Sequence, residues 1–163
     1  MKGLSRSIAF VILASISTSV FALDKSISES YAKVQAAVLK KDSKAMMQLW
    51  LSYVDPGCVS TRKGKVVTYK QMTDMVEPQM KMVKKVNSCK IQVVASKTKA
   101  GKTICTVLTI QSFVINVGGK DSTFDQVTTV EDTWKKIGGK FKIIEIKTIK
   151  ETLKQDGAIV PNS

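Results

Sequence analysis

The sequence QVTTVEDTWKKIGGKFKIIEIKTIK, residues Gln126–Lys150, predicts a β-hairpin on which the rest of the fold depends. Two runs rich in Val, Ile, Thr and aromatic residues flank the pair Gly138-Gly139. A type I′ turn needs a positive φ at both central residues, and glycine adopts that conformation without strain. If these glycines form the turn, Trp134 pairs with Ile143.

The same register assigns the neighbouring side chains to the two faces of the hairpin. It places Asp132 opposite Glu145, on the face that carries Trp134. Ile144 and Ile146 fall on the other face, so the second run is apolar on both faces. Such a strand is typical of a sheet that is covered on both sides. We therefore expect a hairpin buried near its middle, with two carboxylates facing each other.

The first 22 residues have the pattern of a secretory signal peptide. Lys2 and Arg6 give a positive start, an apolar run follows from Ile8 to Val20, and Ala22 precedes the expected cleavage site. A membrane-spanning helix needs roughly 20 apolar residues, and this run is shorter and interrupted, so an uncleaved anchor is the weaker alternative. We expect an exported protein, either periplasmic or extracellular.

Lysine dominates the charge of the chain. The net charge is +13, and outside the leader the only arginine is Arg62. Lysine is a hydrated point charge that is poor at bidentate recognition of phosphate or guanine. We interpret the scattered lysines as a solubilising surface, with contact to an anionic envelope surface as the alternative. Nucleic acid is not expected as a partner, because the chain has no aromatic-basic motif.

Three cysteines follow the leader, and in an oxidising compartment two of them can pair. The predicted strand pairing puts Cys89 and Cys105 out of register, which leaves Cys58 with Cys89 or Cys105 as the candidate disulfide. Three buried free thiols are the alternative. No metal site or cofactor is predicted, because the chain has no histidine and no paired cysteine spacing.

Three helices are predicted before the long strands begin. The first opens with a capping box at Ser26–Glu29 and continues with apolar residues at helical spacing. The second follows an Asp42 cap and ends at a turn around Asp55, where Pro and Gly break the pattern. The third opens with a capping box at Thr68–Gln71, and Pro78 should kink or split it.

Four long antiparallel strands are predicted after the helices. They are residues 89–96, residues 103–117 and the two arms of the Gly138-Gly139 hairpin. A strand as long as 103–117 usually bends. Separate runs of helices and strands indicate an α+β domain, expected here over residues 23–151, with a flexible tail over 152–163.

Several segments of the chain have the pattern of one protein superfamily. They are AVLKKD at 37–42, MQLW at 47–50, the turns at Asp55 and at Lys63–Lys65, and DTWKKIGGKFKII at 132–144. These segments resemble the nuclear transport factor 2-like proteins, also called the SnoaL or ketosteroid-isomerase-like superfamily. The resemblance covers about residues 26–149.

The resemblance implies a cone: a strongly bent antiparallel sheet with three N-terminal helices that close its concave face and leave a pocket. The superfamily includes isomerases, dehydratases, non-catalytic ligand binders and partner-binding subunits, often dimeric through the sheet. Members that carry out acid-base chemistry place His, Asp or Tyr in the cone, and this chain has no His.

Two groups of residues are candidates for a site. Catalytic candidates are the carboxylates Asp55, Asp132 and Glu145, because two neighbouring carboxylates can have their pKa values pushed apart into an acid and a base. The alternative is that they are solvated and neutralised by lysines. Pocket candidates are the aromatic residues Tyr31, Trp50, Tyr53 and Trp134, which can orient a small ligand.

These observations favour an exported, non-catalytic domain that binds a small apolar ligand or a protein partner. The alternatives are an acid-base enzyme of the isomerase or dehydratase kind and a lysine-rich accessory protein of the envelope. An enzyme needs a carboxylate that points into the cone, with a raised pKa and a tyrosine or second acid within reach. A binder needs only an apolar cavity.

Overall fold

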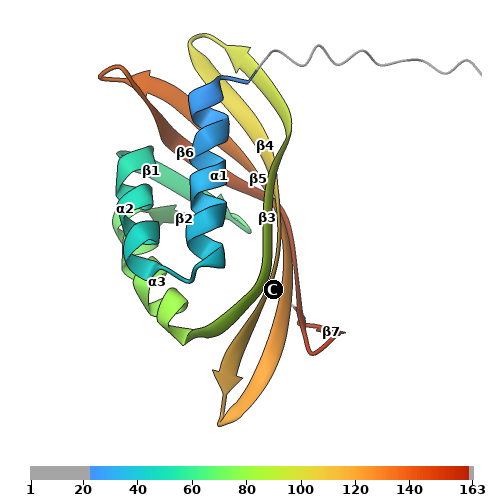
Figure 1. Cartoon of the computed structure of the whole chain (residues 1–163). Coiled ribbons are helices and arrows are strands. Elements are labelled where there is room, and N and C mark those ends of the chain that lie inside the picture. The colour runs from blue at the N-terminus through green and yellow to red at the C-terminus, as the bar shows by residue number, and fades with distance from the viewer. Residues whose placement is uncertain (1–22, 162–163) are drawn as a thin grey trace, which may run out of the picture.

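The computed structural model describes residues 23–161, and the expected signal peptide lies outside this range. The described chain forms three helices and one curved, unclosed sheet of seven strands. The helices lie on the concave side of the sheet (Figure 1). The predicted α+β architecture is therefore confirmed.

Helices and strands alternate only in the first half of the chain. The helices are α1 (Lys25–Leu39), α2 (Ser43–Tyr53) and α3 (Tyr69–Met82). The strands are β1 (Val54–Arg62), β2 (Lys65–Thr68), β3 (Val83–Lys99), β4 (Lys102–Val117), β5 (Lys120–Ile137), β6 (Lys140–Gln155) and β7 (Ala158–Ile159).

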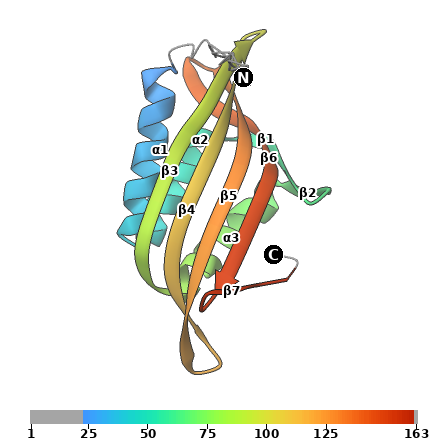
Figure 2. The ribbon, with the colours of Figure 1, turned by 90° about the vertical axis from the view of Figure 1, so that its right-hand side faces the viewer.

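The four long strands β3–β6 form the predicted antiparallel meander, and Figure 2 shows them side by side. The full order is β2-β1-β6-β5-β4-β3, with β7 on β6. β1 runs parallel to β6, so the sheet is mixed rather than purely antiparallel. The turn expected around Asp55 is the start of β1, where the register shifts between Val54 and Val59. Pro56 has no N–H to donate to a ladder, which an irregular strand segment tolerates.

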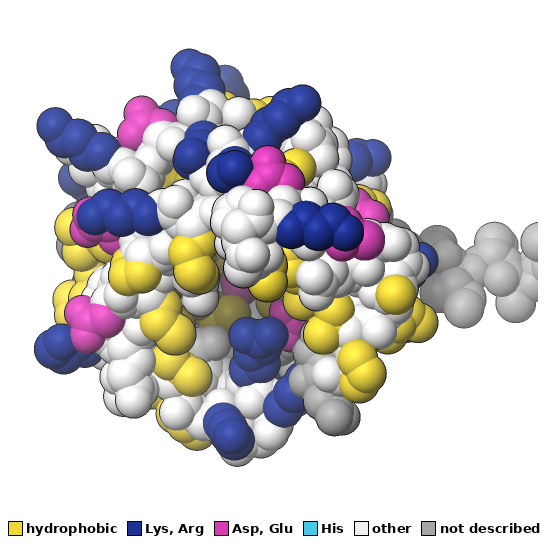
Figure 3. Space-filling view, turned by 90° about the horizontal axis from the view of Figure 1, so that it is seen from below, with side chains coloured by type: hydrophobic (Ala, Val, Ile, Leu, Met, Phe, Trp, Pro, Cys, Tyr) yellow, Lys and Arg dark blue, Asp and Glu magenta, His cyan; other side chains and the backbone are white. Residues whose placement is uncertain are grey.

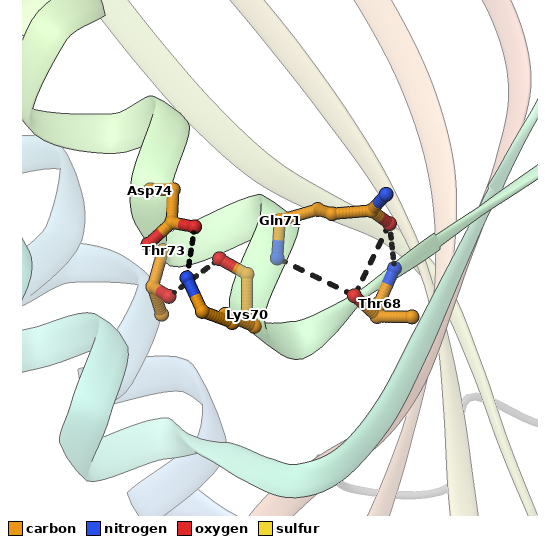
Figure 4. A network of polar contacts seen from close by, with 5 residues as sticks. All are labelled: Thr68, Lys70, Gln71, Thr73 and Asp74. Carbon is orange, nitrogen blue, oxygen red and sulfur yellow. Dashed lines mark hydrogen bonds and ion pairs between the residues drawn. The ribbon is translucent and has the colours of Figure 1, made fainter.

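Side chains cap α2 and α3 as predicted. Asp42 accepts a hydrogen bond from a first-turn N–H over 2.8 Å, and Thr68 and Gln71 form the predicted capping box (Figure 4). The cap of α1 differs from the prediction, because Asp24 rather than Ser26 holds the first turn. Oδ1 of Asp24 accepts from the Ser26 N–H over 2.9 Å and from the Ser26 hydroxyl over 2.6 Å. The Ser26 side chain is therefore already engaged.

Two expectations about continuity need correction. Of the kink and the split expected at Pro78, the split does not occur, because α3 continues through Pro78 to Met82. The chain beyond residue 151 is not a loose tail, because β6 continues to Gln155 and β7 pairs with it. Glu151 also accepts a hydrogen bond from Arg62 of β1 over 2.8 Å, which ties the two parallel strands together.

The central hairpin forms as predicted at its turn. Gly138 and Gly139 have φ values of 56° and 80°, and Trp134 pairs with Ile143. Beyond this pair the register shifts between Thr133 and Trp134. One extra residue on β6 creates a β-bulge there, which bends the strand and re-aims its side chains.

The bulge overturns the predicted pairing of the two carboxylates. Asp132 pairs with Ile146, and Thr133 pairs with Glu145. Ile146 therefore lies on the same face as Asp132 and not on the opposite face as predicted. The hydrophobic pattern alone did not reveal the extra residue, Ile144, because the run is apolar at both parities.

The core lies between the helices and the sheet, and its largest side chain is Trp134, which is 1% exposed. The three cysteines are part of this buried region. Cys58, Cys89 and Cys105 are free thiols, so the structure contains neither of the disulfides considered. The three thiols lie in the core without a disulfide because free cysteine packs as a small apolar residue.

Lysine side chains are spread over the surface of the molecule. In the view of Figure 3 they surround the whole face rather than gather at one place. Among residues 23–161, no helix is both long enough and apolar enough to cross a membrane.

Candidate functional site

A cavity of about 270 Å³ lies between α1, α2 and the concave face of the sheet. Its apolar lining consists of Val34, Met46, Val54, Ile91, Val107, Val130, Ile143 and Ile146. The lining residues that carry a polar side-chain atom are Tyr31, Trp50, Tyr53, Thr109 and Asp132. An apolar hollow with a few placed polar groups is the usual form of a small-molecule site.

Asp132 is the only carboxylate that lines the cavity, and it is 6% exposed. β5 places it there because alternate residues of a strand share a face, and Val130 and Asp132 both face the helices. Opposite it on β6, the bulge brings Ile146 to the same face. The carboxylate is therefore held between apolar neighbours on a rigid strand.

Tyr31 connects this carboxylate to the core. The Tyr31 hydroxyl donates a hydrogen bond to Oδ2 of Asp132 over 2.7 Å and accepts one from Nε1 of Trp134 over 2.8 Å. The Tyr31 and Trp134 rings meet edge to face, with centroids 5.6 Å apart. The Tyr31 hydroxyl is thus fixed from two sides, and the donor it presents to Asp132 is pre-oriented.

Burial sets the protonation behaviour of this pair. Removal from water raises the pKa of Asp132 to about 6, while the hydrogen bond from Tyr31 opposes that rise. Burial, and then the charge of Asp132, raise the pKa of Tyr31 far above its usual value. The Tyr31 hydroxyl therefore stays protonated and can always donate, whereas the Asp132 carboxyl group titrates at about pH 6.

Trp50 of α2 carries a buried polar atom that the described residues leave unpaired. Its indole lines the cavity, and its Nε1 is buried without a hydrogen-bond partner among the described residues. Trp134, the second tryptophan of the chain, does not line the cavity, and its N–H is satisfied by Tyr31. The two indoles therefore differ in position: Trp134 packs behind Tyr31, and Trp50 is part of the cavity wall.

No protein-family model matches this chain, and no curated protein matches it. Solved structures do match. A putative scytalone dehydratase from Novosphingobium aromaticivorans aligns with a TM-score of 0.59 and 10% identity, over 78% of this chain and 84% of that chain. An NTF2-like protein of unknown function in nutrient uptake, from Rhodospirillum rubrum, aligns with a TM-score of 0.57 and 11% identity, over 82% and 98%.

A type 2 hexachlorocyclohexane dehydrochlorinase aligns with a TM-score of 0.58 and 12% identity, over 85% of this chain and 93% of that chain. Together with the bent sheet and its three helices, these alignments decide the fold. The chain has the NTF2-like fold. The solved structures that share it include proteins described as enzymes and one described as having unknown function. At these identities the likeness concerns the fold, so the function has to be argued from the cavity.

Three of the four predicted pocket residues line the cavity of this NTF2-like cone. Tyr31, Trp50 and Tyr53 all reach it from the two N-terminal helices. Trp134 was predicted to line it and instead packs behind Tyr31. Trp134 belongs instead to the cluster of buried core residues.

Of the three predicted catalytic carboxylates, the NTF2-like cone encloses only Asp132. Asp55 accepts a hydrogen bond from the N–H of Gly57 over 2.8 Å and serves as a turn residue. Glu145 is exposed, because the bulge places it opposite Thr133 on the outer face. The predicted pair of Asp132 and Glu145 therefore does not exist.

Sequence reasoning did not pair Asp132 with Tyr31, and no local signal could have done so. The two residues are 101 positions apart, on a helix and a strand that meet only when the cone closes. Within residues 23–161, no group of three or more Cys, Asp or Glu side chains is placed to hold a metal ion. The polar side chains that line the cavity are thus one carboxylate, two phenols, one threonine hydroxyl and one indole.

Proposed function

We propose that this chain binds a small, largely apolar molecule in the cavity between α1, α2 and the sheet. The observation that carries the proposal is an apolar hollow of about 270 Å³ whose few polar groups include the hydrogen-bonded pair of Tyr31 and buried Asp132. Apolar walls supply binding free energy and the polar pair orients the ligand. If the leader directs export, the ligand is one met outside the cytoplasm.

A cavity-filling variant tests this proposal. Thr109 lines the cavity, whereas its neighbour Leu108 lies on the other face of β4. Thr109→Phe should fill the hollow and weaken the binding of a neutral hydrocarbon such as indane or decalin by at least about tenfold. Leu108→Phe is the matched control and should bind as wild type does. Calorimetry gives the dissociation constants, and equal binding by both variants would refute the proposal.

Acid-base catalysis is the second candidate, and a specific observation favours it. Asp132 is buried in the cavity with a pKa of about 6 and a tyrosine donor 2.7 Å away. A general base works best when its pKa lies near the working pH. Asp132 would remove a proton from a carbon next to a carbonyl group, and the proton would return to the substrate from the same carboxyl group.

Deuterium exchange tests this candidate without knowledge of the natural substrate. The protein is incubated in D2O with 1-indanone, and proton NMR follows the loss of the hydrogens next to the carbonyl. Wild type should accelerate the exchange, and Asp132→Asn should abolish the acceleration while its circular dichroism remains that of a folded protein. Exchange at the same rate in both proteins would remove Asp132 from the catalytic role and leave the binding proposal standing.

A further inference from the structure

The carboxylate of Asp132 has no counter-ion among the described residues. It is 6% exposed, and none of those residues forms an ion pair with it. Buried charges in native proteins are normally paired, so an unpaired one calls for a cause. Glu151 of β6 shows the usual arrangement: its side chain is also 6% exposed, and its carboxylate pairs with Arg62 over 2.6 Å and accepts a hydrogen bond from Gln126 over 2.6 Å.

One oxygen of this carboxylate is open to a ligand. Oδ2 accepts a hydrogen bond from the Tyr31 hydroxyl over 2.7 Å. The described residues give Oδ1 no hydrogen-bond partner, and Oδ1 is not among their fully enclosed unpaired atoms, so it keeps accessible surface. Asp132 lies on β5 between β4 and β6, and its side chain lines the cavity on the concave face. A molecule in the cavity therefore reaches Oδ1.

The other lining residues suit a cation better than an anion. Asp132 is the only charged residue among the described residues that line the cavity, although the chain has 26 basic residues against 13 acidic ones. Tyr31, Trp50 and Tyr53 add three aromatic rings to the wall, and aromatic rings attract organic cations. The hydroxyls of Tyr53 and Thr109 also lack a partner among the described residues, but a hydroxyl donates or accepts and so does not select for charge.

The titratable groups around Asp132 cannot serve as its counter-ion. Tyr31 of α1, Cys58 of β1 and Cys105 of β4 lie close enough for the charge of Asp132 to act on them. Burial, followed by that charge, raises the pKa of both thiols to about 12 and the pKa of Tyr31 far above its usual value. All three groups are therefore neutral at pH 7. On β6 the residue opposite Asp132 is the apolar Ile146.

We infer that the ligand of the cavity is an organic ammonium ion with a compact apolar body, and that Oδ1 of Asp132 accepts a hydrogen bond from its N–H group. This inference rests on the proposed ligand-binding function and narrows the ligand class. The ammonium group supplies the positive charge that the protein does not place beside the carboxylate, whereas a neutral molecule of the same shape leaves it unpaired. Asp132 is then a specificity-determining residue.

The size of the cavity limits the apolar body. Sites for drug-sized ligands occupy about 300–1,000 Å³, and this cavity has a volume of about 270 Å³. Two fused rings are therefore a suitable skeleton for probes. Four probes share the indane skeleton and differ in charge: 2-aminoindane is an ammonium ion at pH 7.5, 2-indanol and indane are neutral, and indane-2-carboxylate is an anion.

Calorimetry with these probes at pH 7.5 tests the inference. Wild type should bind 2-aminoindane at least about tenfold more tightly than 2-indanol or indane, because hydrogen bonds to charged groups are the stronger ones, and it should bind the carboxylate most weakly. Asp132→Asn should reduce the preference for the amine to less than about twofold. Glu145→Gln is the matched control, because it removes a carboxylate from the exposed outer face, and it should keep the preference of wild type.

Carbon-13 NMR of wild type gives a measurement that depends on no variant. The side-chain carboxyl signal of Asp132 is titrated with pH, in the free protein and with each probe bound. Bound 2-aminoindane should lower the pKa of Asp132, because a neighbouring positive charge favours the carboxylate. Bound indane should not lower it.

The outcomes separate this inference from the function on which it rests. If 2-indanol or indane binds as tightly as 2-aminoindane and the pKa of Asp132 does not fall, the inference is wrong and the cavity is still a binding site. If Asp132→Asn keeps the preference for the amine, or Glu145→Gln loses it, the preference does not come from the cavity carboxylate, and the inference is wrong. If none of the four probes binds to wild type, the proposed function fails, and the inference fails with it.

Discussion

The hydroxyl of Tyr31 donates a hydrogen bond to Oδ2 of Asp132 over 2.7 Å and so connects α1 to β5 across the cavity. The same hydroxyl accepts the indole N–H of Trp134. A single phenol therefore holds the one carboxylate that lines the cavity and satisfies a tryptophan that is buried in the core.

Tyr31→Phe should destabilise the protein by roughly 2 kcal/mol, because it removes two part-buried hydrogen bonds and leaves the Trp134 N–H unpaired. It should also raise the pKa of Asp132 further, since the hydrogen bond from Tyr31 lowers that pKa. Urea unfolding measures the first effect. Tyr53→Phe is the control, because the described chain offers the Tyr53 hydroxyl no hydrogen-bond partner; an equal loss in both variants would contradict the prediction.

Asp132 should make stability fall as the pH rises from about 4 to 6. Its pKa is about 6 in the folded protein, against an ordinary value of 3.8 for an aspartate side chain, so the folded protein binds more protons in this window. The stability present below pH 3.8 is lost progressively as the pH rises through the folded pKa, by about 3 kcal/mol in total.

Asp132→Asn removes this contribution. Wild type should therefore lose free energy of unfolding between pH 4 and pH 7 through Asp132, and the variant should not. The free energy of unfolding of the variant minus that of wild type should thus be larger at pH 7 than at pH 4. Urea titrations at both pH values give this difference, and the comparison with wild type cancels carboxyl groups whose pKa is lowered, such as Asp121. A difference that is independent of pH would show that Asp132 is not titrating in the cavity.

The cysteines should be unreactive in the native protein. Burial, followed by the charge of Asp132, raises the pKa of both Cys58 and Cys105 to about 12, and burial raises that of Cys89. A thiol reacts as its thiolate, so a colorimetric thiol reagent at pH 8 should label the folded protein slowly. In guanidinium without reductant all three thiols should react; a count of one would instead identify a disulfide.

The capping box of α3 should be worth about 1 kcal/mol. Thr68 accepts from the Gln71 N–H, and the Gln71 side chain accepts from the Thr68 N–H over 2.9 Å (Figure 4). Thr68→Ala removes the cap and should lower the unfolding midpoint in urea. Thr73→Ala, on the same helix, removes only a hydroxyl that donates to the Lys70 carbonyl, and it should have a smaller effect.

Local patterns of residues were sufficient for most of the elements. The Gly138-Gly139 turn, the Asp42 cap and the Thr68 capping box formed as predicted, because each depends on residues close together in the chain. The parallel pairing of β1 with β6 was missed, since those strands are distant in sequence and carry no shared signal. The bulge at Ile144 was missed because either register leaves apolar residues on both faces.

The sequence by itself determined the three helices, the long meander and most of the aromatic residues that line the cavity. Periodicity, caps and glycine turns are local, and local chemistry is enough to specify them. Only the tertiary structure decided that Asp132 faces inward and Glu145 outward. A one-residue bulge reverses which face a side chain occupies, and the contact between Tyr31 and Asp132 exists only after the helix packs on the sheet.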